Sequence, residues 1–285
     1  MPKVLVTGGS GKLGRAVLKD LVAHGYEVLN VDQAAPREAL CPTLRIDLRD
    51  FGQVAAAILG GTDEKQGPFD AVVHLAAIPA PGLQANPTTF ANNVPATYNV
   101  LEACRLAGIR NVVFASSETV LGLPFETPPP YVPVDEDYAP RPESAYSLGK
   151  RLDEAMAAEF CRWDKELKIV GLRFSNVMDV EDYAAFPAFD HDARLRKWNL
   201  WAYIDARDGA QAVRRGLEAG FKGFEPFIIA NADSVMTRSN AALMAEVFPT
   251  VPHKTTLSPN GTLLSIEKAR KLLGYSPQHS WRNHV

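Results

Sequence analysis

The chain of 285 residues has little cysteine: Cys41, Cys104 and Cys161 lie far apart in the sequence. An odd number of widely spaced cysteines argues against a disulfide framework, and their spacing is not that of a zinc site. We therefore expect no bound metal and a reducing, cytoplasmic environment.

Long hydrophobic runs and an excess of one charge are missing as well. The N-terminus, Met1-Pro2-Lys3-Val4-Leu5-Val6, is too short an apolar run for a signal peptide or a membrane span. The net charge is only −3, so no basic surface is available to attract nucleic acid or anionic lipid. With 46% hydrophobic residues, the composition is that of a globular enzyme with a substantial core and without nucleic-acid or membrane partners.

Short apolar runs rich in β-branched residues alternate with longer stretches of helical periodicity, which is typical of parallel strands joined by crossover helices. The pattern predicts strands at Lys3–Thr7, Glu27–Asp32, Leu44–Asp47, Ala71–Leu75, Val112–Ser116, Ile169–Arg173 and Phe227–Ala230. It predicts helices at Lys12–His24, Phe51–Leu59, Thr88–Ala107, Ser144–Lys165, Ala206–Ala219, Thr237–Val247 and Ser265–Leu273. We expect an α/β fold, a doubly wound parallel Rossmann sheet with a small C-terminal substrate lobe.

The regular alternation loosens after Arg173. We expect residues 1–173 to form an NAD(P)-binding Rossmann domain, and residues 174–285 to form a small substrate-binding lobe with some elements returning to that domain. Within the first part, Leu123–Pro142 contains seven prolines and is predicted to be a long loop, because proline interrupts helices and interior strands.

A glycine-rich segment, Thr7-Gly8-Gly9-Ser10-Gly11-Lys12-Leu13-Gly14, follows the first predicted strand and opens the first predicted helix. Gly8 permits a tight turn, Gly11 lets the backbone approach a pyrophosphate, and Gly14 lets the helix pack closely on the strand. The N–H groups at the helix start, near Lys12 and Leu13, are suited to an anion. A glycine triplet alone can be an ordinary turn, but here strand, loop, helix and second strand occur in the order of a dinucleotide site.

Asp32 ends the second predicted strand, where a carboxylate accepts hydrogen bonds from the adenosine ribose hydroxyls and repels a 2′-phosphate. This position favours NAD over NADP, although Lys12, Arg15 and Arg37 are close enough in sequence to offset part of the repulsion. The alternative is that Asp32 is simply a turn residue.

Tyr146 and Lys150 are four residues apart at the start of a predicted helix and therefore share one face. A neighbouring ammonium favours the phenolate form of tyrosine, which makes Tyr146 a candidate base and Lys150 its partner. Such pairs are also common on ordinary amphipathic helices. Ser117, at the carboxyl end of the fifth predicted strand, supplies a hydroxyl at the sheet edge where such folds bind ligands, unless it only satisfies the loop backbone.

Ordered motifs over nearly the whole chain support this interpretation: TGGSGKLG at Thr7, HLAA at His74, NNVPATYNVLEA at Asn92, FASSETVLG at Phe114, YSLGK at Tyr146, LRFSNV at Leu172 and LLGYSP at Leu272. With these motifs the sequence resembles the extended short-chain dehydrogenase/reductase family of the NAD-dependent epimerase/dehydratase type. The resemblance implies that Ser117, Tyr146 and Lys150 are catalytic. It also implies that Tyr146, Lys150 and a further set contact or hold the cofactor, namely Asp47, Leu48, Leu75, Ala76, Ala77 and Asn93.

Within this family the likeness is divided. FASSETVLG, the short chain and the closing GYSPQHSW resemble uronate dehydrogenases, whereas Phe174-Ser175-Asn176-Val177 is similar to the pattern of nucleotide-sugar 4-epimerases, in which the residue at Asn176 contacts the substrate. The family resemblance also implies a homodimer through the helices predicted at Thr88–Ala107 and Ser144–Lys165.

The stretch between Val177 and Ala206, about thirty residues, leaves little room to grip a nucleotide diphosphate, so we expect a small sugar or sugar acid. Between Tyr183 and Tyr203 this stretch mixes aromatic rings with arginines, including Arg194, and suits stacking on a sugar and pairing with a carboxylate. The alternative is that the aromatic side chains pack the lobe and the arginines are solvated.

Three functions remain open from the sequence. The first is an NAD-dependent dehydrogenase acting on a sugar hydroxyl, with Tyr146 as base, Ser117 orienting the oxygen and Lys150 as their cationic partner. The second is a 4-epimerase with tightly held NAD and the same triad. The third is a non-catalytic regulator that binds the dinucleotide.

Overall fold

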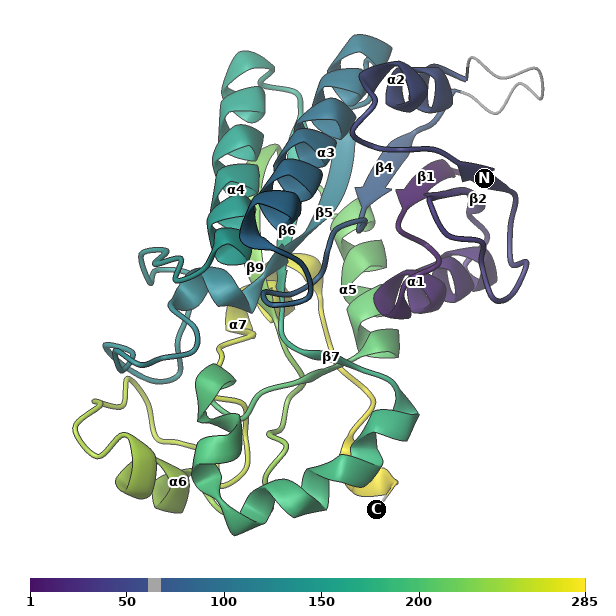
Figure 1. Ribbon diagram of the computed structural model, residues 1–285. Helices are drawn as coiled ribbons and strands as arrows, with labels where there is room; N and C mark the ends of the chain where they lie inside the picture. The colour runs from purple at the N-terminus through teal and green to yellow at the C-terminus, as the bar shows by residue number, and fades with distance from the viewer. Residues whose placement is uncertain (61–67, 285) are drawn as a thin grey trace.

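The computed structural model describes residues 1–60 and 68–284. In this part of the chain, seven parallel strands form one sheet in the order β3-β2-β1-β4-β5-β6-β9 (Figure 1). The strands are β1 (Lys3–Thr7), β2 (Glu27–Asp32), β3 (Thr43–Arg45), β4 (Ala71–His74), β5 (Asn111–Ser117), β6 (Lys168–Phe174) and β9 (Gly223–Ile229). The strand order reverses between β1 and β4, which confirms the predicted doubly wound Rossmann sheet.

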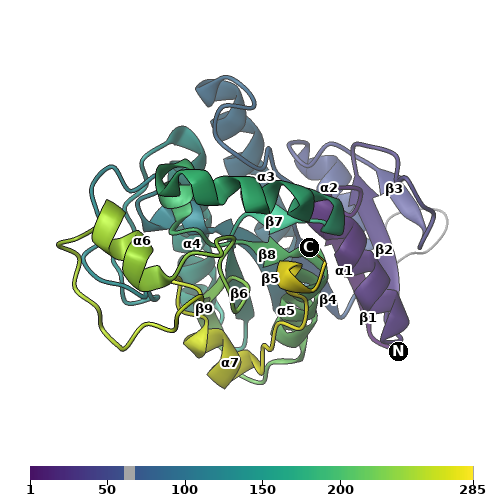
Figure 2. The same ribbon diagram turned by 90° about the horizontal axis from the view of Figure 1, so that it is seen from below.

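Two layers of helices cover the sheet because its strands present apolar side chains to both faces. In β1, Val4 and Val6 pack into one core while Leu5 packs into the other. Figure 2 shows α1, α5 and α7 on one side of the sheet and α2, α3 and α4 on the other. These helices are α1 (Lys12–Ala23), α2 (Phe51–Leu59), α3 (Asn86–Ala107), α4 (Ala145–Trp163), α5 (Ala206–Glu218) and α7 (Glu267–Leu273).

The edge strand β9 is longer than its predicted span, Phe227–Ala230, and begins at Gly223. Glu225 and Pro226 make this segment read as a loop in the sequence. However, β9 pairs with β6 over its whole length, and an edge strand tolerates proline because one side of it needs no backbone donor. The predicted strand Leu44–Asp47 is instead Thr43–Arg45, so Asp47 lies beyond the paired part of the strand.

A smaller group of elements lies at the end of the sheet where the parallel strands finish (Figure 1). It comprises β7 (Val177–Met178), β8 (Ile204–Asp205), the 3-10 helices η2 (Val180–His191) and η3 (Ala193–Asn199), α6 (Asn240–Val247) and η4 (Trp281–Asn283). The sequence did not predict η2 and η3. Their aromatic side chains, among them Tyr183 and Phe186, are buried against one another and against Tyr203, which explains why this stretch lacks a simple helical periodicity.

The proline-rich segment from Leu123 to Pro142 contains neither helix nor strand, as predicted. It is nevertheless ordered, because Val132 and Val134 are buried and form isolated parallel bridges with His253 and Leu264. The loop begins after the 3-10 helix η1 (Glu118–Leu121), which directly continues β5. No helix among the described residues is both long and apolar enough to cross a membrane.

Candidate active site

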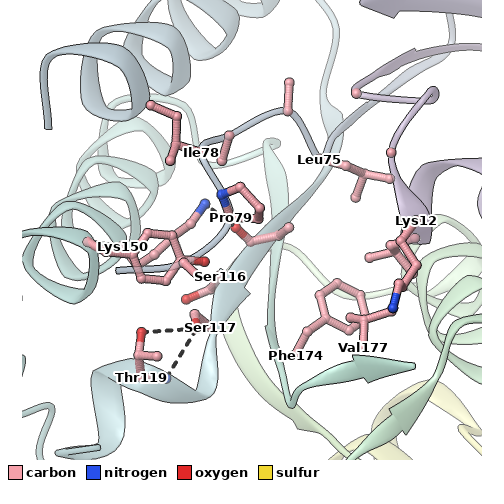
Figure 3. Close-up of a pocket in the computed structure, with 18 of the residues that line it drawn as sticks. Lys12, Leu75, Ile78, Pro79, Ser116, Ser117, Thr119, Lys150, Phe174 and Val177 are labelled. Atoms are coloured by element: carbon pink, nitrogen blue, oxygen red, sulfur yellow. Dashed lines mark hydrogen bonds between the residues drawn. The ribbon is translucent and has the colours of Figure 1, made fainter. Parts of the chain in front are cut away.

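A cavity of about 950 Å³ opens at the carboxyl edge of the sheet, beside the reversal of strand order. Its walls come from the segments after β1, β2, β3, β4, β5 and β6, from α3 and η3, and from the start of α4. Figure 3 shows Lys150 and Ser117 on one side of this cavity and Lys12 and Val177 on the other.

The structure brings most of the predicted site residues to this one cavity. Those that line it are Gly8, Gly11, Lys12, Leu13, Gly14, Asp32, Asp47, Leu48, Leu75, Ala76, Ala77, Ser117, Tyr146, Lys150 and Asn176. Two predicted residues, Asn93 and Arg194, are not among the lining residues.

The glycine loop is shaped by close backbone contacts. Gly8 has a positive φ of 76°, and a Cβ atom there would lie 2.6 Å from the backbone nitrogen of Ala76. A Cβ atom on Gly14 would lie 2.1 Å from the carbonyl oxygen of Gly8, so Gly14 lets the helix pack on the glycine loop itself rather than on a strand. Gly11 is the N-cap of α1 and makes no side-chain cap, which leaves the first N–H groups of the helix available to an anion. This arrangement fits a dinucleotide pyrophosphate.

Asp32 is held at the end of β2 by two backbone donors. Its carboxylate accepts hydrogen bonds from the N–H groups of Ser10 (2.9 Å) and Ala34 (3.0 Å), which fix its orientation at the cavity wall. Two of the cations that the sequence placed nearby are committed elsewhere, since Lys12 forms an ion pair with Asp182, and Arg15 lies 3.1 Å from Asp179. Neither of these two cations forms an ion pair with Asp32.

Asp47, just beyond β3, lines the same cavity as Asp32. Hydrogen bonds from the Arg49 guanidinium and backbone hold the pKa of Asp47 at about 2, so its carboxylate is charged at any working pH. Leu48 is buried beside it, and its carbonyl oxygen accepts a hydrogen bond from Asn99 of α3.

The side chain of Asn93 holds the loop that follows β4. Its side chain accepts a hydrogen bond from the N–H of Ile78 (2.8 Å) and donates one to the carbonyl of the same residue (3.0 Å). It therefore ties α3 to the loop that contains Leu75 to Ile78 and lines the cavity. Asn93 is not among the lining residues, and its buried amide engages this loop, so its predicted part in holding the cofactor site stays a prediction.

The two adjacent serines at the end of β5 have different surroundings. Ser116 donates a hydrogen bond to Glu154 (2.7 Å), whose carboxylate is also held by Arg173 (2.8 Å), so Ser116 helps to join β5, α4 and β6. The hydroxyl of Ser117 instead accepts hydrogen bonds from the backbone and side chain of Thr119 (3.2 and 3.0 Å; Figure 3). Ser117 lines the cavity.

Tyr146 and Lys150 lie in the first two turns of α4, which begins with a capping box between Ser144 and Ser147. The Lys150 ammonium donates a 2.6 Å hydrogen bond to the carbonyl of Ala115, which anchors α4 to β5 two residues before Ser117. Asp153 lies 3.5 Å from the same ammonium, and burial raises the pKa of Asp153 to about 6. The three predicted catalytic residues are thus fixed around one end of the cavity.

His74 ends β4 but is not among the lining residues. Its ring bridges the hydroxyls of Thr7 (2.7 Å) and Thr97 (3.2 Å), and burial lowers the pKa of His74 to about 3. His74 is therefore a neutral link between β1, β4 and α3.

Glu118 is a cavity residue that sequence reasoning passed over. It follows Ser117 directly, lines the cavity and is almost fully buried. Its carboxyl group accepts a hydrogen bond from Asn199 (3.2 Å), and burial raises its pKa to about 7. The motif FASSETVLG contained the signal, since an ionisable residue immediately after the serine at a strand end faces the ligand edge of the sheet.

Arg194 does not lie at the cavity. Its side chain is 66% exposed, and its guanidinium lies 3.9 Å from Glu246 on α6. The 3-10 geometry of η3 turns Arg194 outward, while Trp198 of the same element lines the cavity. The prediction of Arg194 as a substrate ligand is therefore corrected, and most aromatic residues between Tyr183 and Tyr203 pack the lobe.

Replacing Glu118 with Gln is expected to change stability in a pH-dependent way. The pKa of Glu118 is about 7 in the folded chain against 4.5 for the ordinary group, so its burial costs stability as pH rises from 4.5 through 7. Relative to the wild type, Glu118→Gln should gain about 3 kcal/mol between pH 4 and pH 8. Urea unfolding at both pH values measures this gain, with the exposed Glu126→Gln as control. An equal effect of Glu118→Gln at both pH values would show that the carboxyl is not buried as described.

The fold and the cavity define a dinucleotide-binding enzyme of the Rossmann type. The sequence model of the NAD dependent epimerase/dehydratase family matches residues 4–223, so the chain belongs to this family. Its cofactor is NAD, which the cradle formed by Gly8, Gly14 and the start of α1 fits.

Curated relatives include both reaction types considered above. The UDP-glucose 4-epimerase of Corynebacterium glutamicum is 31% identical over 313 residues, covering 98% of this chain and 92% of that protein. The L-arabinose 1-dehydrogenase (NAD(P)(+)) of Haloferax volcanii is 28% identical over 228 residues, covering 77% of this chain and 84% of that protein. Against several other curated 4-epimerases, the chain spans only about half of their length.

Solved structures share the fold over the whole chain. A short-chain dehydrogenase/reductase superfamily protein from Agrobacterium tumefaciens with bound NAD has a TM-score of 0.74 at 25% identity, covering 98% of this chain and 94% of that one. A mutated uronate dehydrogenase has a TM-score of 0.67 at 20% identity, covering 100% of this chain and 85% of that one, and shows the common fold alone.

Proposed function

We propose that this protein is an NAD-dependent dehydrogenase that oxidises a hydroxyl group of a small sugar or sugar acid. The observation that carries the proposal is the placement of Ser117, Tyr146 and Lys150 around one end of a cavity whose other end fits the dinucleotide. The short η2 and η3 elements leave a compact lobe above this end, which favours a small substrate.

Each residue of the triad has a separate task in this proposal. The Tyr146 phenolate accepts the proton of the substrate hydroxyl, and Ser117 donates a hydrogen bond that orients the same oxygen. Lys150 stabilises the phenolate by its charge and is itself held in place by Ala115. Asn176, between β6 and β7, also lines the cavity, and we propose that it contacts the sugar. NAD, when bound, accepts the hydride.

The experiment incubates the purified protein with NAD or NADP and a panel of aldoses, uronic acids and UDP-sugars. NADH formation and the epimer composition of the sugars are followed in the same samples. The proposal expects NADH to accumulate with free sugars and not with UDP-sugars. Interconversion of UDP-sugars without NADH would contradict it.

The second candidate is a nucleotide-sugar 4-epimerase, which uses the same triad and retains its NAD. It is favoured by the similarity to the C. glutamicum enzyme over 92% of that protein's length. Tight co-purification of NAD together with UDP-sugar interconversion would establish it. A non-catalytic regulator would not need the triad of Ser117, Tyr146 and Lys150, so we favour either enzyme over it.

Asp32 is proposed to select NAD through the adenosine ribose. Asp32→Asn removes the charge, and we expect NAD to bind about 10-fold to 100-fold more weakly while the preference over NADP shrinks, because a charged hydrogen bond is lost. Fluorescence titration with both cofactors measures the two dissociation constants. Glu27→Gln, at the opposite end of β2, is the matched control. An unchanged ratio of the two constants would remove Asp32 from this role.

A further inference from the structure

The face of α4 that carries Tyr146 and Lys150 continues with a buried acid one turn further on. Tyr146, Lys150 and Asp153 are spaced by four and three residues, so their side chains leave the same side of the helix. The Asp153 carboxylate lies 3.5 Å from the Lys150 ammonium, and the two side chains are 0% and 5% exposed. Asp153 is not among the residues that line the cavity, so it is placed to act through Lys150 rather than on a ligand.

The carboxylate of Asp153 has no other partner. Neither of its oxygens has a hydrogen-bond partner among residues 1–60 and 68–284. Thr97 of α3 also acts on this carboxyl, but its hydroxyl proton is donated to the carbonyl of Asn93 (3.3 Å). Burial raises the pKa of Asp153 to about 6 against the effect of Lys150, so the carboxylate is ionised from neutral pH upward. A buried charge without hydrogen bonds is costly and calls for a role.

Two other acids near this part of α4 have partners of their own. Glu154, the next residue along the helix, is held by Arg173 of β6 (2.8 Å). Glu143, which lines the cavity just before the helix, is held by Arg141 (2.6 Å). Neither carboxylate forms an ion pair with Lys150.

The remaining groups that act on Lys150 carry no charge. From β4, His74 is neutral at working pH, because burial and the Lys150 charge lower the pKa of His74 to about 3. From β5, the Ala115 carbonyl accepts a 2.6 Å hydrogen bond from the ammonium but does not neutralise it. Within the described chain, Asp153 is therefore the acid that pairs with Lys150.

A second buried lysine shows what carbonyl groups alone achieve. Lys168 of β6 donates hydrogen bonds to the carbonyls of Gly216 (3.0 Å), Leu217 (2.8 Å) and Ala219 (2.7 Å) and has no ion pair within the described residues. Burial lowers the pKa of Lys168 to about 8. Carbonyl oxygens therefore do not keep a buried ammonium protonated through alkaline pH, whereas a carboxylate at close range favours the charged form.

We propose that Asp153 is a positioning residue for the triad, the buried counter-ion that keeps Lys150 protonated so that its charge can stabilise the Tyr146 phenolate. This inference rests on the dehydrogenase function proposed above, in which the phenolate is the base. Without the Asp153 charge, Lys150 should resemble Lys168 and lose its proton at a lower pH than in the wild type.

The first experiment follows kcat/KM against pH with NAD and a sugar that the wild type oxidises. In Asp153→Asn we expect the alkaline limb of the profile to move about one pH unit or more toward neutral. At about pH 9 the variant should be roughly tenfold less active than the wild type, while near pH 7 the two should agree within about threefold. An unmoved alkaline limb, or an even loss at every pH, would overturn the inference, because a merely structural residue does not shift the limb.

Asp164→Asn is the matched control. Asp164 is the C-cap of the same helix and pairs with Arg110 (2.8 Å), so this substitution removes an equal charge at the other end of α4. The pH profile should match that of the wild type. A shift as large as in Asp153→Asn would show that the total charge of the helix, and not the ion pair with Lys150, sets the limb.

An NMR titration of the NAD-loaded protein, isotope-labelled at lysine Cε, measures protonation without turnover. The signals of Lys150 and Lys168 are assigned from Lys150→Arg and Lys168→Arg. In the wild type we expect Lys150 to keep its proton at the pH where Lys168 loses its own, and in Asp153→Asn the two should titrate within about one pH unit of each other.

Loss of the Lys150 proton at or below the pH of the Lys168 transition in the wild type would overturn the inference even if Asp153→Asn fails to fold. No NADH from any free sugar would instead defeat the dehydrogenase proposal. The NMR titration needs no substrate and would still test the ion pair of Lys150 and Asp153 in that case.

Discussion

Tyr146→Phe should lower kcat by about 10²-fold to 10⁴-fold, the usual contribution of a positioned general base. Tyr146 is almost fully buried at the cavity wall, and the loss of one oxygen leaves its ring and the packing of α4 in place. The dissociation constant for NAD should therefore stay near that of the wild type. Steady-state kinetics with a free sugar and fluorescence titration with NAD measure the two quantities.

Tyr131→Phe is the matched control for this substitution. Tyr131 lies in the proline-rich loop, where its hydroxyl donates a 2.7 Å hydrogen bond to Asp135, and it is not among the cavity residues. Its turnover should match the wild type. Turnover near the wild-type value in Tyr146→Phe would reject the assignment of the base, whatever the control shows.

Gly8→Ala should abolish tight NAD binding and lower the free energy of unfolding by about 2–5 kcal/mol. The φ of 76° imposes left-handed strain on alanine, and its Cβ would meet the backbone of Ala76 at 2.6 Å, which adds the cost of overpacking. Ala76 lines the cavity, so relief of the clash displaces the wall that faces the dinucleotide. Urea unfolding and NAD titration test both effects.

Gly25→Ala tests the backbone strain of a positive φ without the steric clash that Gly8→Ala adds. Gly25 also has a positive φ, 80°, but a Cβ atom there meets nothing within 4 Å. We expect this variant to lose only about 1–2 kcal/mol of stability and to bind NAD normally. Equal NAD affinity in Gly8→Ala and Gly25→Ala would contradict the view that the β1–α1 turn forms the cofactor cradle.

Most of the sheet could be predicted because buried parallel strands leave continuous apolar runs, as in Val4 to Val6 and Val112 to Phe114. The same logic missed the first residues of β9, where Pro226 is tolerated because the strand lies at the sheet edge. It also failed for η2 and η3, whose aromatic side chains pack in a cluster and follow no single helical face.

Sequence motifs identified the residues that meet at the cavity but not how each one acts there. The glycine spacing and the pair Tyr146 and Lys150 predicted contacts that depend on local backbone geometry. The positions of Asn93, Arg194 and Glu118 depend instead on which way a loop or a 3-10 helix turns its side chains, and this is decided by tertiary packing. The predicted homodimer through α3 and α4 and the boundary at residue 173 stay predictions.

The most direct test of the dehydrogenase proposal follows the hydrogen atom itself. A neutral aldose carrying deuterium at its oxidised carbon is incubated with the wild-type protein and NAD, and the deuterium content of the nicotinamide and of the sugars is measured by mass spectrometry. We predict that the label appears in free NADH in proportion to the oxidised sugar. If the label stays in the sugar pool, and a parallel incubation with UDP-sugars interconverts them without forming NADH, the protein is an epimerase and the proposal is wrong.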